Sequence, residues 1–329
     1  MKTRSVALQC GLAAVGLALA YSTWQREPDH APGEVVVLDL KKNDQPKIRY
    51  EDGDKFTELT MSEEAGEPVV WLHLSGKPEQ KQPVREVRSS EQGVKLMEKF
   101  LPLRASRALG VLSKDKEKEF GFADAKKKLI IETRGQSHKF TVGKSPFNVG
   151  EPYVKDESDG KIYVLGNGIL SDLDTANVRL LDRSWHPPAW NEYDQIKVTA
   201  GGKQRTLTTI PGANAFQTKL ASAKTPAKAD DLAKNWHDKV LRLSSTEVLG
   251  KGEKPVAGEP VISLKIEYSF KGKPVTWLEV GRVASVIGNQ SGPPTGAEFY
   301  LRSKSTAGWN RTPTSDEILT EGAKVAGTE

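Results

Sequence analysis

The same order of predicted elements occurs twice along the chain, and this repetition constrains the fold more than any other feature. Each time, a hairpin is followed by a helix, a second hairpin, a Val-Gly-basic triplet, a loop and a strand. The triplets are Val142-Gly143-Lys144 and Val280-Gly281-Arg282. Their spacing of about 140 residues far exceeds the ~20–50 residues of a solenoid repeat. We therefore predict an α+β fold of two duplicated modules, each an antiparallel sheet with a packed helix, after an N-terminal transmembrane or signal helix.

The predicted strands rest on apolar alternation and on turn dipeptides. Asp52-Gly53, Gly201-Gly202 and Lys271-Gly272 are typical hairpin turns, and Arg134-Gly135-Gln136 connects two more strand-like runs. Strands or hairpins are expected over residues 34–40, 48–61, 69–74, 128–133, 137–142, 151–154, 161–165, 194–209, 265–270, 275–280 and 296–302.

Helices are predicted where a capping residue precedes apolar residues at helical spacing. Ser89-Ser90 opens the first helix, and Pro102 ends it. A second amphipathic helix is expected over 230–243, and shorter ones over 168–180 and 315–325.

These elements divide the chain into four parts. Residues 1–24 form a signal anchor or signal peptide, and residues 25–33, rich in proline and polar residues, form a tether. Residues 34–185 form the first module and residues 186–329 the second, a size that suits two ordinary domains.

The N-terminus has the pattern of a membrane-targeting segment. Lys2 and Arg4 precede an uncharged run over 5–24, close to the ~20 residues that span a bilayer as a helix. The positive-inside bias predicts a single-pass protein of the bacterial inner membrane, held by residues 5–24, with its body in the periplasm. The alternative is cleavage after Ala20 and a soluble periplasmic product. Cys10 lacks the context of a lipid site, and the body that follows has no cysteine and hence no disulfide.

The charge balance argues against a nucleic-acid partner. The chain has 48 Lys and Arg against 43 Asp and Glu. Its pI of about 9.0 therefore reflects a slight excess in a charge-rich chain and does not indicate a nucleic-acid patch.

The motifs that carry catalysis or cofactors are missing from the sequence. Gly143-Lys144-Ser145 resembles the end of a phosphate loop, but His138 stands where the first glycine is needed. The five histidines have no metal-ligand spacing, and Ser291 lies in a Gly/Pro loop rather than in a nucleophile elbow. We predict no enzyme activity, no catalytic residue, no cofactor and no metal.

Two tryptophans around a Pro-Pro pair are the candidate binding or interface residues. Trp185 and Trp190 could form an aromatic platform for a sugar or peptide, or they could pin the linker between the modules by burying apolar area. We favour the second interpretation.

The block from Ser90 to Trp185 resembles the bacterial family known as domain of unknown function 4340. The similarity lies in LGVLSKDKEKEFGFADAKKKLIIETRGQSHKFTVGKS and YVKDESDGKIYVLGNGILSDL. Phe120-Gly121-Phe122 stands where that family usually has Tyr/Phe-Gly-Leu, and the polar stretch from Gly250 to Pro260 departs from it. The resemblance implies a membrane-anchored protein associated with an ABC-type transport system of the kind linked to gliding motility. It implies no catalytic residues.

These observations lead to one functional expectation with alternatives. We expect a membrane-tethered, non-catalytic periplasmic protein for binding or assembly, accessory to an ABC-type transport or gliding-motility-like system and with an envelope protein as its partner. The alternatives are a protein that binds envelope polysaccharide or peptide, and a cell-wall enzyme.

Overall fold

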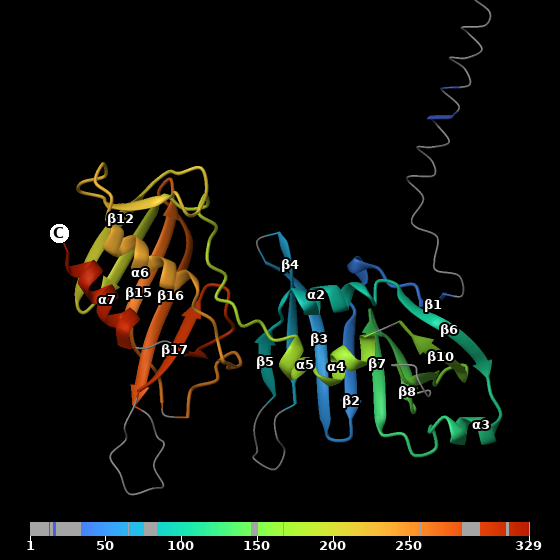
Figure 1. Cartoon of the computed structure of the whole chain (residues 1–329). Coiled ribbons are helices and arrows are strands. Elements are labelled where there is room, and N and C mark those ends of the chain that lie inside the picture. Colours follow the sequence, from blue (N-terminus) through green and yellow to red (C-terminus); the bar gives the residue numbers. More distant parts are fainter. Residues whose placement is uncertain are drawn as a thin grey trace, which may run out of the picture.

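Strands dominate the architecture. The computed structural model describes residues 34–328 except 65, 76–83, 146–150, 167, 257, 285–296 and 314–315, together with Ala13, Gly16 and Leu17. This part of the chain is 45% strand and 20% helix, in two large antiparallel sheets (Figure 1). The predicted α+β class is therefore wrong, and the protein is mostly β.

The first sheet has ten strands in the order β1-β6-β10-β9-β8-β7-β2-β3-β4-β5. They are β1 (Val35–Leu38), β2 (Lys47–Asp52), β3 (Lys55–Glu64), β4 (Glu67–Leu74), β5 (Arg85–Arg88), β6 (Leu103–Val111), β7 (Lys127–Thr133), β8 (Gln136–Val142), β9 (Tyr153–Asp156) and β10 (Lys161–Leu165).

The second sheet has eight strands in the order β13-β12-β11-β15-β16-β17-β18-β14. They are β11 (Gln195–Ala200), β12 (Lys203–Ile210), β13 (Lys219–Ser222), β14 (Glu247–Val248), β15 (Val261–Phe270), β16 (Lys273–Ala284), β17 (Ala297–Ser303) and β18 (Asn310–Thr312).

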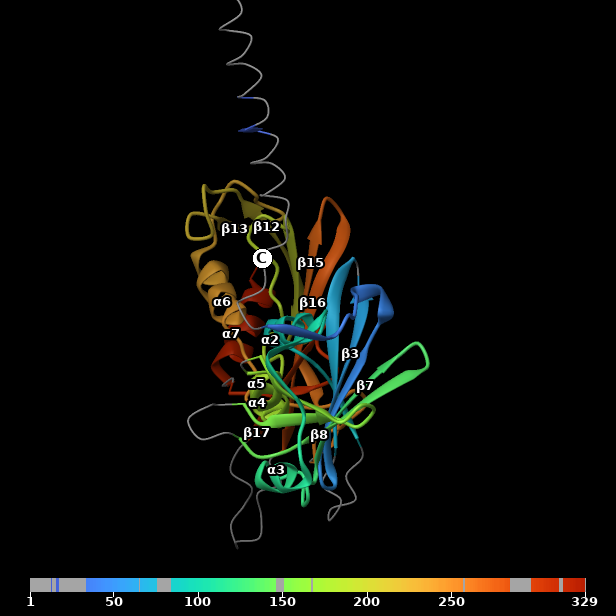
Figure 2. The ribbon, with the colours of Figure 1, turned by 90° about the vertical axis from the view of Figure 1, so that its right-hand side faces the viewer.

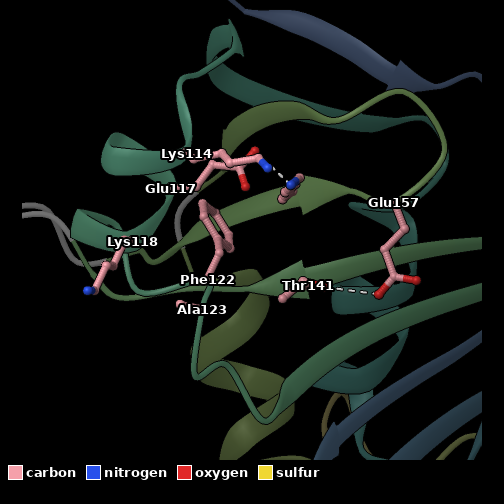
Figure 3. A pocket seen from close by; sticks show the side chains of 8 residues that line it. Lys114, Glu117, Lys118, Phe122, Ala123, Thr141 and Glu157 are labelled. Atoms are coloured by element: carbon pink, nitrogen blue, oxygen red, sulfur yellow. Dashed lines mark hydrogen bonds and ion pairs between the residues drawn. The ribbon is translucent and has the colours of Figure 1, made fainter.

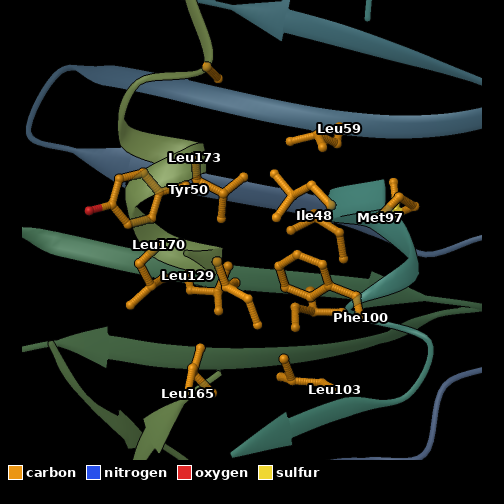
Figure 4. Close-up of a cluster of buried hydrophobic side chains, with 14 of the residues drawn as sticks. Ile48, Tyr50, Leu59, Met97, Phe100, Leu103, Leu129, Leu165, Leu170 and Leu173 are labelled. Carbon is orange, nitrogen blue, oxygen red and sulfur yellow. The ribbon is translucent and has the colours of Figure 1, made fainter. Parts of the chain in front are cut away.

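Helices cover one face of each sheet. Apolar side chains of α2 and α4, with Ala176 of α5, close the first core, in which Met97, Leu170 and Leu173 are buried (Figure 4). α6 and α7 close the second core, in which Trp236, Val240 and Val325 are fully or almost fully buried. The helices are α2 (Glu91–Glu98), α3 (Lys114–Glu119), α4 (Ile169–Asp174), α5 (Ala176–Arg179), α6 (Asp231–Leu241) and α7 (Asp316–Gly327), with a short 3-10 turn, η1 (Lys42–Asp44).

The opposite face of the first sheet, called the outer face below, carries polar side chains. Side chains alternate along a strand. Because Phe140 and Val154 point into the core, Thr141 and Lys155 point outward, as do Arg49 and Trp71 on other strands.

Eight strands in each sheet follow one order. The run β6-β10-β9-β8-β7-β2-β3-β4 corresponds to β14-β18-β17-β16-β15-β11-β12-β13. The order along the chain also corresponds: three strands, a helix (α2 or α6), one strand, four strands and closing helices. The first sheet adds β1 beside β6 and β5 beside β4.

The strand registers extend this correspondence to single residues. Asp52 and Ala200 each precede the first hairpin turn of their sheet. Asp52 pairs with Lys127, which pairs with Val142 on the next strand. In the same way, Ala200 pairs with Leu264, which pairs with Val280. The triplets Val142-Gly143-Lys144 and Val280-Gly281-Arg282 therefore occupy equivalent positions. The turns of these hairpins also match: Arg134-Gly135 and Lys271-Gly272 both have positive φ at two residues, as a type I′ turn requires.

The α+β prediction failed because several strands carry weak sequence signals. β5, β6, β13, β14 and β18 lie at or near sheet edges, and none of them was predicted. β6, LRASRALGV, contains alanine, glycine and arginine rather than alternating β-branched residues. β14 and β18 have only two and three residues. Such strands are held by their neighbours rather than by their own propensity.

The predicted single-pass anchor requires a correction as well. Among the residues that the structure describes, no helix is long and apolar enough to cross a membrane. The segment 5–24, the cleavage site after Ala20 and the tether 25–33 lie outside the described residues, apart from Ala13, Gly16 and Leu17. The assignment to a transmembrane, single-pass inner-membrane protein is therefore dropped.

The two sheets meet at an edge (Figures 1 and 2). Arg85 of β5 forms an ion pair with Glu253 at 2.9 Å and donates to the Val248 carbonyl. The backbone N–H of Lys251 donates to the carbonyl of Glu86 in β5 at 2.8 Å. Val248 itself packs in the first hydrophobic core. The loop after β14 thus covers the β5 edge of the first sheet.

Candidate functional site

The structure places the two candidate tryptophans in different surroundings. Trp185 is fully buried in the second core, with its ring 6.0 Å from that of Tyr268. Its carbonyl accepts a hydrogen bond from the Ser303 hydroxyl at 2.9 Å. Trp190 lies on the surface and is 37% exposed. A platform formed by both rings would require Trp185 to leave the core.

A pocket on the outer face of the first sheet is a stronger candidate for a binding site (Figure 3). It has a volume of about 380 Å³ and lies between α3 and strands β8 and β9. Phe122 forms an apolar wall, and charged groups surround it. The lining residues are Lys114, Glu117, Lys118, Phe122, Ala123, Thr141, Lys155 and Glu157.

Packing between two sequence motifs builds this pocket. The Phe120 ring stacks on Tyr153, with ring centroids 4.1 Å apart and planes 6° apart. The N–H of Lys144 donates to the Phe120 carbonyl at 2.8 Å. A Cβ on Gly143 would lie 2.5 Å from that carbonyl oxygen, so only glycine allows the approach. Phe120-Gly121-Phe122 is thereby clamped against the Val-Gly-Lys triplet.

Several charged groups of the pocket are held by ion pairs or hydrogen bonds to one another. Lys155 pairs with Glu117 of α3 at 2.7 Å. The Thr141 hydroxyl donates to Glu157 at 2.9 Å, as Figure 3 shows, and Lys128 lies 3.9 Å from the same carboxylate. Two lysines of the lining, Lys114 and Lys118, stay exposed. An aromatic wall with fixed charges beside it suits a polar or charged side chain of a partner.

Glu151 is buried, as a catalytic acid often is, but it serves as a helix cap. Glu151 is 3% exposed, and burial raises the pKa of its carboxyl. Its two oxygens accept hydrogen bonds from the N–H groups of Gly168 at 2.7 Å and Leu170 at 3.4 Å. These donors belong to the N-terminal end of α4, so this carboxylate stabilises a helix start.

One histidine is enclosed in the second core. His237 is 1% exposed, and burial lowers its pKa to about 4. Its Nε2 shares a hydrogen bond of 2.9 Å with the Tyr268 hydroxyl. Burial also raises the pKa of neighbouring Tyr193 to about 12. These groups are neutral at physiological pH and form part of the core packing.

Two other histidines considered as metal ligands form contacts within the fold. His73 shares a hydrogen bond with Thr60 at 3.3 Å, and His186 contacts Asp182 at 2.5 Å. In the described part of the chain, no group of three or more His, Cys, Asp or Glu side chains could hold a metal ion. Cys10, His30 and Ser291 lie outside the described residues.

Gly143-Lys144-Ser145 does not have the free amides of a phosphate loop. The N–H of Gly143 donates to the Tyr153 carbonyl at 2.8 Å, and the N–H of Lys144 is taken by Phe120. Both amides are thus used inside the fold.

Comparison with family models, with curated proteins and with solved structures gave no match. The resemblance to the domain of unknown function 4340 family stays a prediction, carried by the motifs that form the pocket in Figure 3.

Sequence reasoning missed the pocket because α3 has no apolar face. The segment Lys114–Glu119 has the sequence KDKEKE and buries no residue, so it has no apolar periodicity from which a helix could be predicted. The signal that could have found it is the pair of glycine motifs, whose close packing places α3 over the sheet.

Proposed function

We propose that this protein is a non-catalytic binding or assembly protein of the bacterial envelope, which works by contact with a protein partner. The partner class is a component of an ABC-type transport or gliding-motility-like system, as the family resemblance implies. The observation that carries the proposal is the outer face of the first sheet, which α2, α4 and α5 leave uncovered and onto which the pocket in Figure 3 opens.

The side chains of this face are held in place before any partner binds. The Arg49 guanidinium pairs with Glu51 at 2.7 Å and Glu58 at 3.4 Å, and lies 3.8 Å from the centre of the Phe56 ring. The Trp71 indole N–H donates to the Ser62 hydroxyl at 3.2 Å. Ordered side chains lose less conformational entropy on association, which favours a binding role.

Site-specific photo-crosslinking in the native bacterium tests the proposal. Benzoylphenylalanine is introduced at Ala123, which is exposed at the pocket, and at Val178 on α5, which is 61% exposed on the helical side. We expect one crosslinked protein from position 123, a transporter subunit by mass spectrometry, and none from position 178. Charge reversal at Lys114 and Lys118 should weaken the crosslink severalfold.

The opposite result would be equal crosslinking from both positions, or a crosslink at position 123 that charge reversal leaves unchanged. Either result would mean that the outer face is not the contact surface.

A second candidate function is binding of a small peptide or polysaccharide fragment. The Phe122 wall beside the Lys155–Glu117 pair favours it, since sugars and peptides pack on aromatic rings and bond to charged groups. A thermal-shift screen against sugars and peptides separates the two. A stabilising ligand whose effect disappears in Phe122→Ala would support this second function.

A further inference from the structure

One stretch of strand edge in the second sheet has no partner among the residues that the structure describes, whereas its equivalent in the first sheet is paired. Leu59 pairs with Leu72 in the first sheet, and Leu207 pairs with Ser222 at the same place in the second. By this register, Gln204 of β12 corresponds to Phe56 of β3.

The first sheet satisfies the peptide groups at this position. The N–H of Phe56 donates to the Ser75 hydroxyl at 3.0 Å, and its carbonyl accepts from the Ser75 N–H at 2.9 Å. Both groups point toward β4, whose chain continues alongside β3 as far as Ser75.

In the second sheet, the chain departs from β12 earlier. The last contact on this side is the Ala223 N–H donating to the Thr206 carbonyl at 3.0 Å. Pairing of β13 with β12 covers only Leu207 to Ile210. Residues of odd number in β12 bond toward β11, as the Thr209 N–H does to Asp194. The N–H and carbonyl of Gln204 therefore face away from β11 along an unpaired edge.

A basic groove lies along this edge. It has a volume of about 590 Å³ and is lined by residues of β12, of the end of β13 with the turn after it, and of the end of α7. Three cationic side chains, Lys203, Arg205 and Lys224, line it. Among the residues that the structure describes, the lining contains no carboxylate. Asp230, close by, is engaged with Arg205 at 2.7 Å.

The arginine of the groove is anchored and keeps spare donors. Its side chain is 9% exposed, and its Nη1 atom bonds to Asp230 and to the Val325 carbonyl. Within the described residues, no hydrogen bond uses its other terminal nitrogen, Nη2, and Lys203 and Lys224 form no ion pair. An anchored guanidinium flanked by two exposed lysines matches carboxylates of a bound chain.

We propose that this groove binds an extended acidic segment of a protein partner, which adds as a strand along the free edge of β12 at Gln204. The main chain of the segment pairs with the Gln204 peptide groups, and its carboxylates face Lys203, Arg205 and Lys224. The mode is β-strand addition, in which backbone hydrogen bonds give affinity and side-chain pockets give specificity. The inference concerns the second sheet and is independent of the outer face of the first.

Fluorescence anisotropy on the purified protein tests this inference. The probe is a labelled short peptide that alternates Glu and Val. The comparison peptides carry Lys in place of Glu, or Pro in the middle so that the strand cannot pair. We expect binding of the acidic peptide alone, weakening as salt rises. Equal binding of the acidic and basic peptides would overturn the proposal.

Two variants separate charge recognition from strand pairing. Lys203→Glu combined with Lys224→Glu should weaken binding about tenfold or more, whereas Lys273→Glu, an exposed lysine outside the groove, should leave it unchanged. Gln204→Pro removes the edge N–H without touching the bonds to β11, and should also weaken binding about tenfold. Wild-type binding by Gln204→Pro would rule out strand addition, and wild-type binding by the double variant would rule out the basic groove. Melting curves confirm that each variant is folded.

Discussion

The two sheets are built on one plan of eight strands and differ in what is added to it. The first sheet carries β1 and β5 at its ends and α3 over its outer face. Among the described residues, the second sheet has no counterparts of β1, β5 and α3, and part of its β12 edge is open. The shared hairpins and covering helices supply stability in both. The two binding surfaces that we propose lie at these additions and gaps.

The conserved geometry is clearest at the glycine of each triplet. In both sheets another part of the chain lies close to this glycine: Phe120 in the first, and the start of the paired strand β15 in the second. A Cβ on Gly143 would meet the Phe120 carbonyl oxygen at 2.5 Å, and one on Gly281 would meet the Pro260 side chain at 2.8 Å. The close approach thus supports the pocket of Figure 3 in the first sheet, whereas in the second it joins two neighbouring strands.

The largest expected effect comes from the second core. Trp185→Ala removes a fully buried ring and should destabilise the protein by about 3–5 kcal/mol, measured by urea unfolding. Hydrogen exchange should accelerate in β11, β15 and β16 while the first sheet stays protected. Trp190→Ala, the matched surface variant, should cost less than about 1 kcal/mol. Equal acceleration in both sheets would show that they unfold as one unit.

The next largest effect is a loss of stability at low pH that we expect in the second core, which encloses His237. Burial lowers the pKa of His237 from 6.5 to about 4. The unfolded chain therefore binds the proton more tightly than the folded one. The stabilisation is complete above about pH 6.5 and is lost progressively toward pH 4, to a total of about 3 kcal/mol.

Denaturant unfolding between these pH values measures this loss, with exchange protection followed separately in each sheet. His237→Gln keeps a hydrogen-bonding group beside Tyr268 but does not titrate in this range, so its pH slope should be flatter than that of the wild type. An unchanged slope would assign the acid sensitivity to other groups.

A smaller difference is expected at the two triplet glycines. Gly143→Ala forces a methyl group against a backbone oxygen and should cost about 1–3 kcal/mol. Gly281→Ala should cost less, because its nearest neighbour is a proline side chain at 2.8 Å rather than a carbonyl oxygen at 2.5 Å. Gly166→Ala, with 3.8 Å to its nearest neighbour, serves as the control. The inference that both glycines are closely approached would be refuted if Gly281→Ala were as mild as the control.

The sequence predicted the central part of each sheet because strand alternation and turn chemistry agree there. The hairpins at Arg134-Gly135, Gly201-Gly202 and Lys271-Gly272 have strongly β-forming flanks, and all three were found. The helix at 230–243 was found as α6, whose cap, Asp230, accepts a hydrogen bond from the Ala233 N–H. The edge strands depend on neighbours that only the folded sheet provides.

The candidate sites were harder to predict, for a different reason. Trp185 and Trp190 are close in sequence and chemically alike, but the first faces the Tyr268 ring inside the core and the second faces solvent. The basic groove joins Lys203 and Lys224 across two strands and a turn, and its defining property is an unpaired peptide group at Gln204. Neither property belongs to a local stretch of sequence.

The position of α7 sets the timing of assembly. Val325 and Ala326 are buried in the second core, and the Ile318 carbonyl accepts the hydrogen bond of the Trp236 indole. Since a growing chain exposes its residues in order, the second core stays open until synthesis has passed residue 326. A chain cut short before α7 would present the apolar side of α6 to solvent, where quality-control proteases recognise such surfaces. We therefore expect the second core to close only after α7 has been synthesised, whereas no described residue of α7 belongs to the first core.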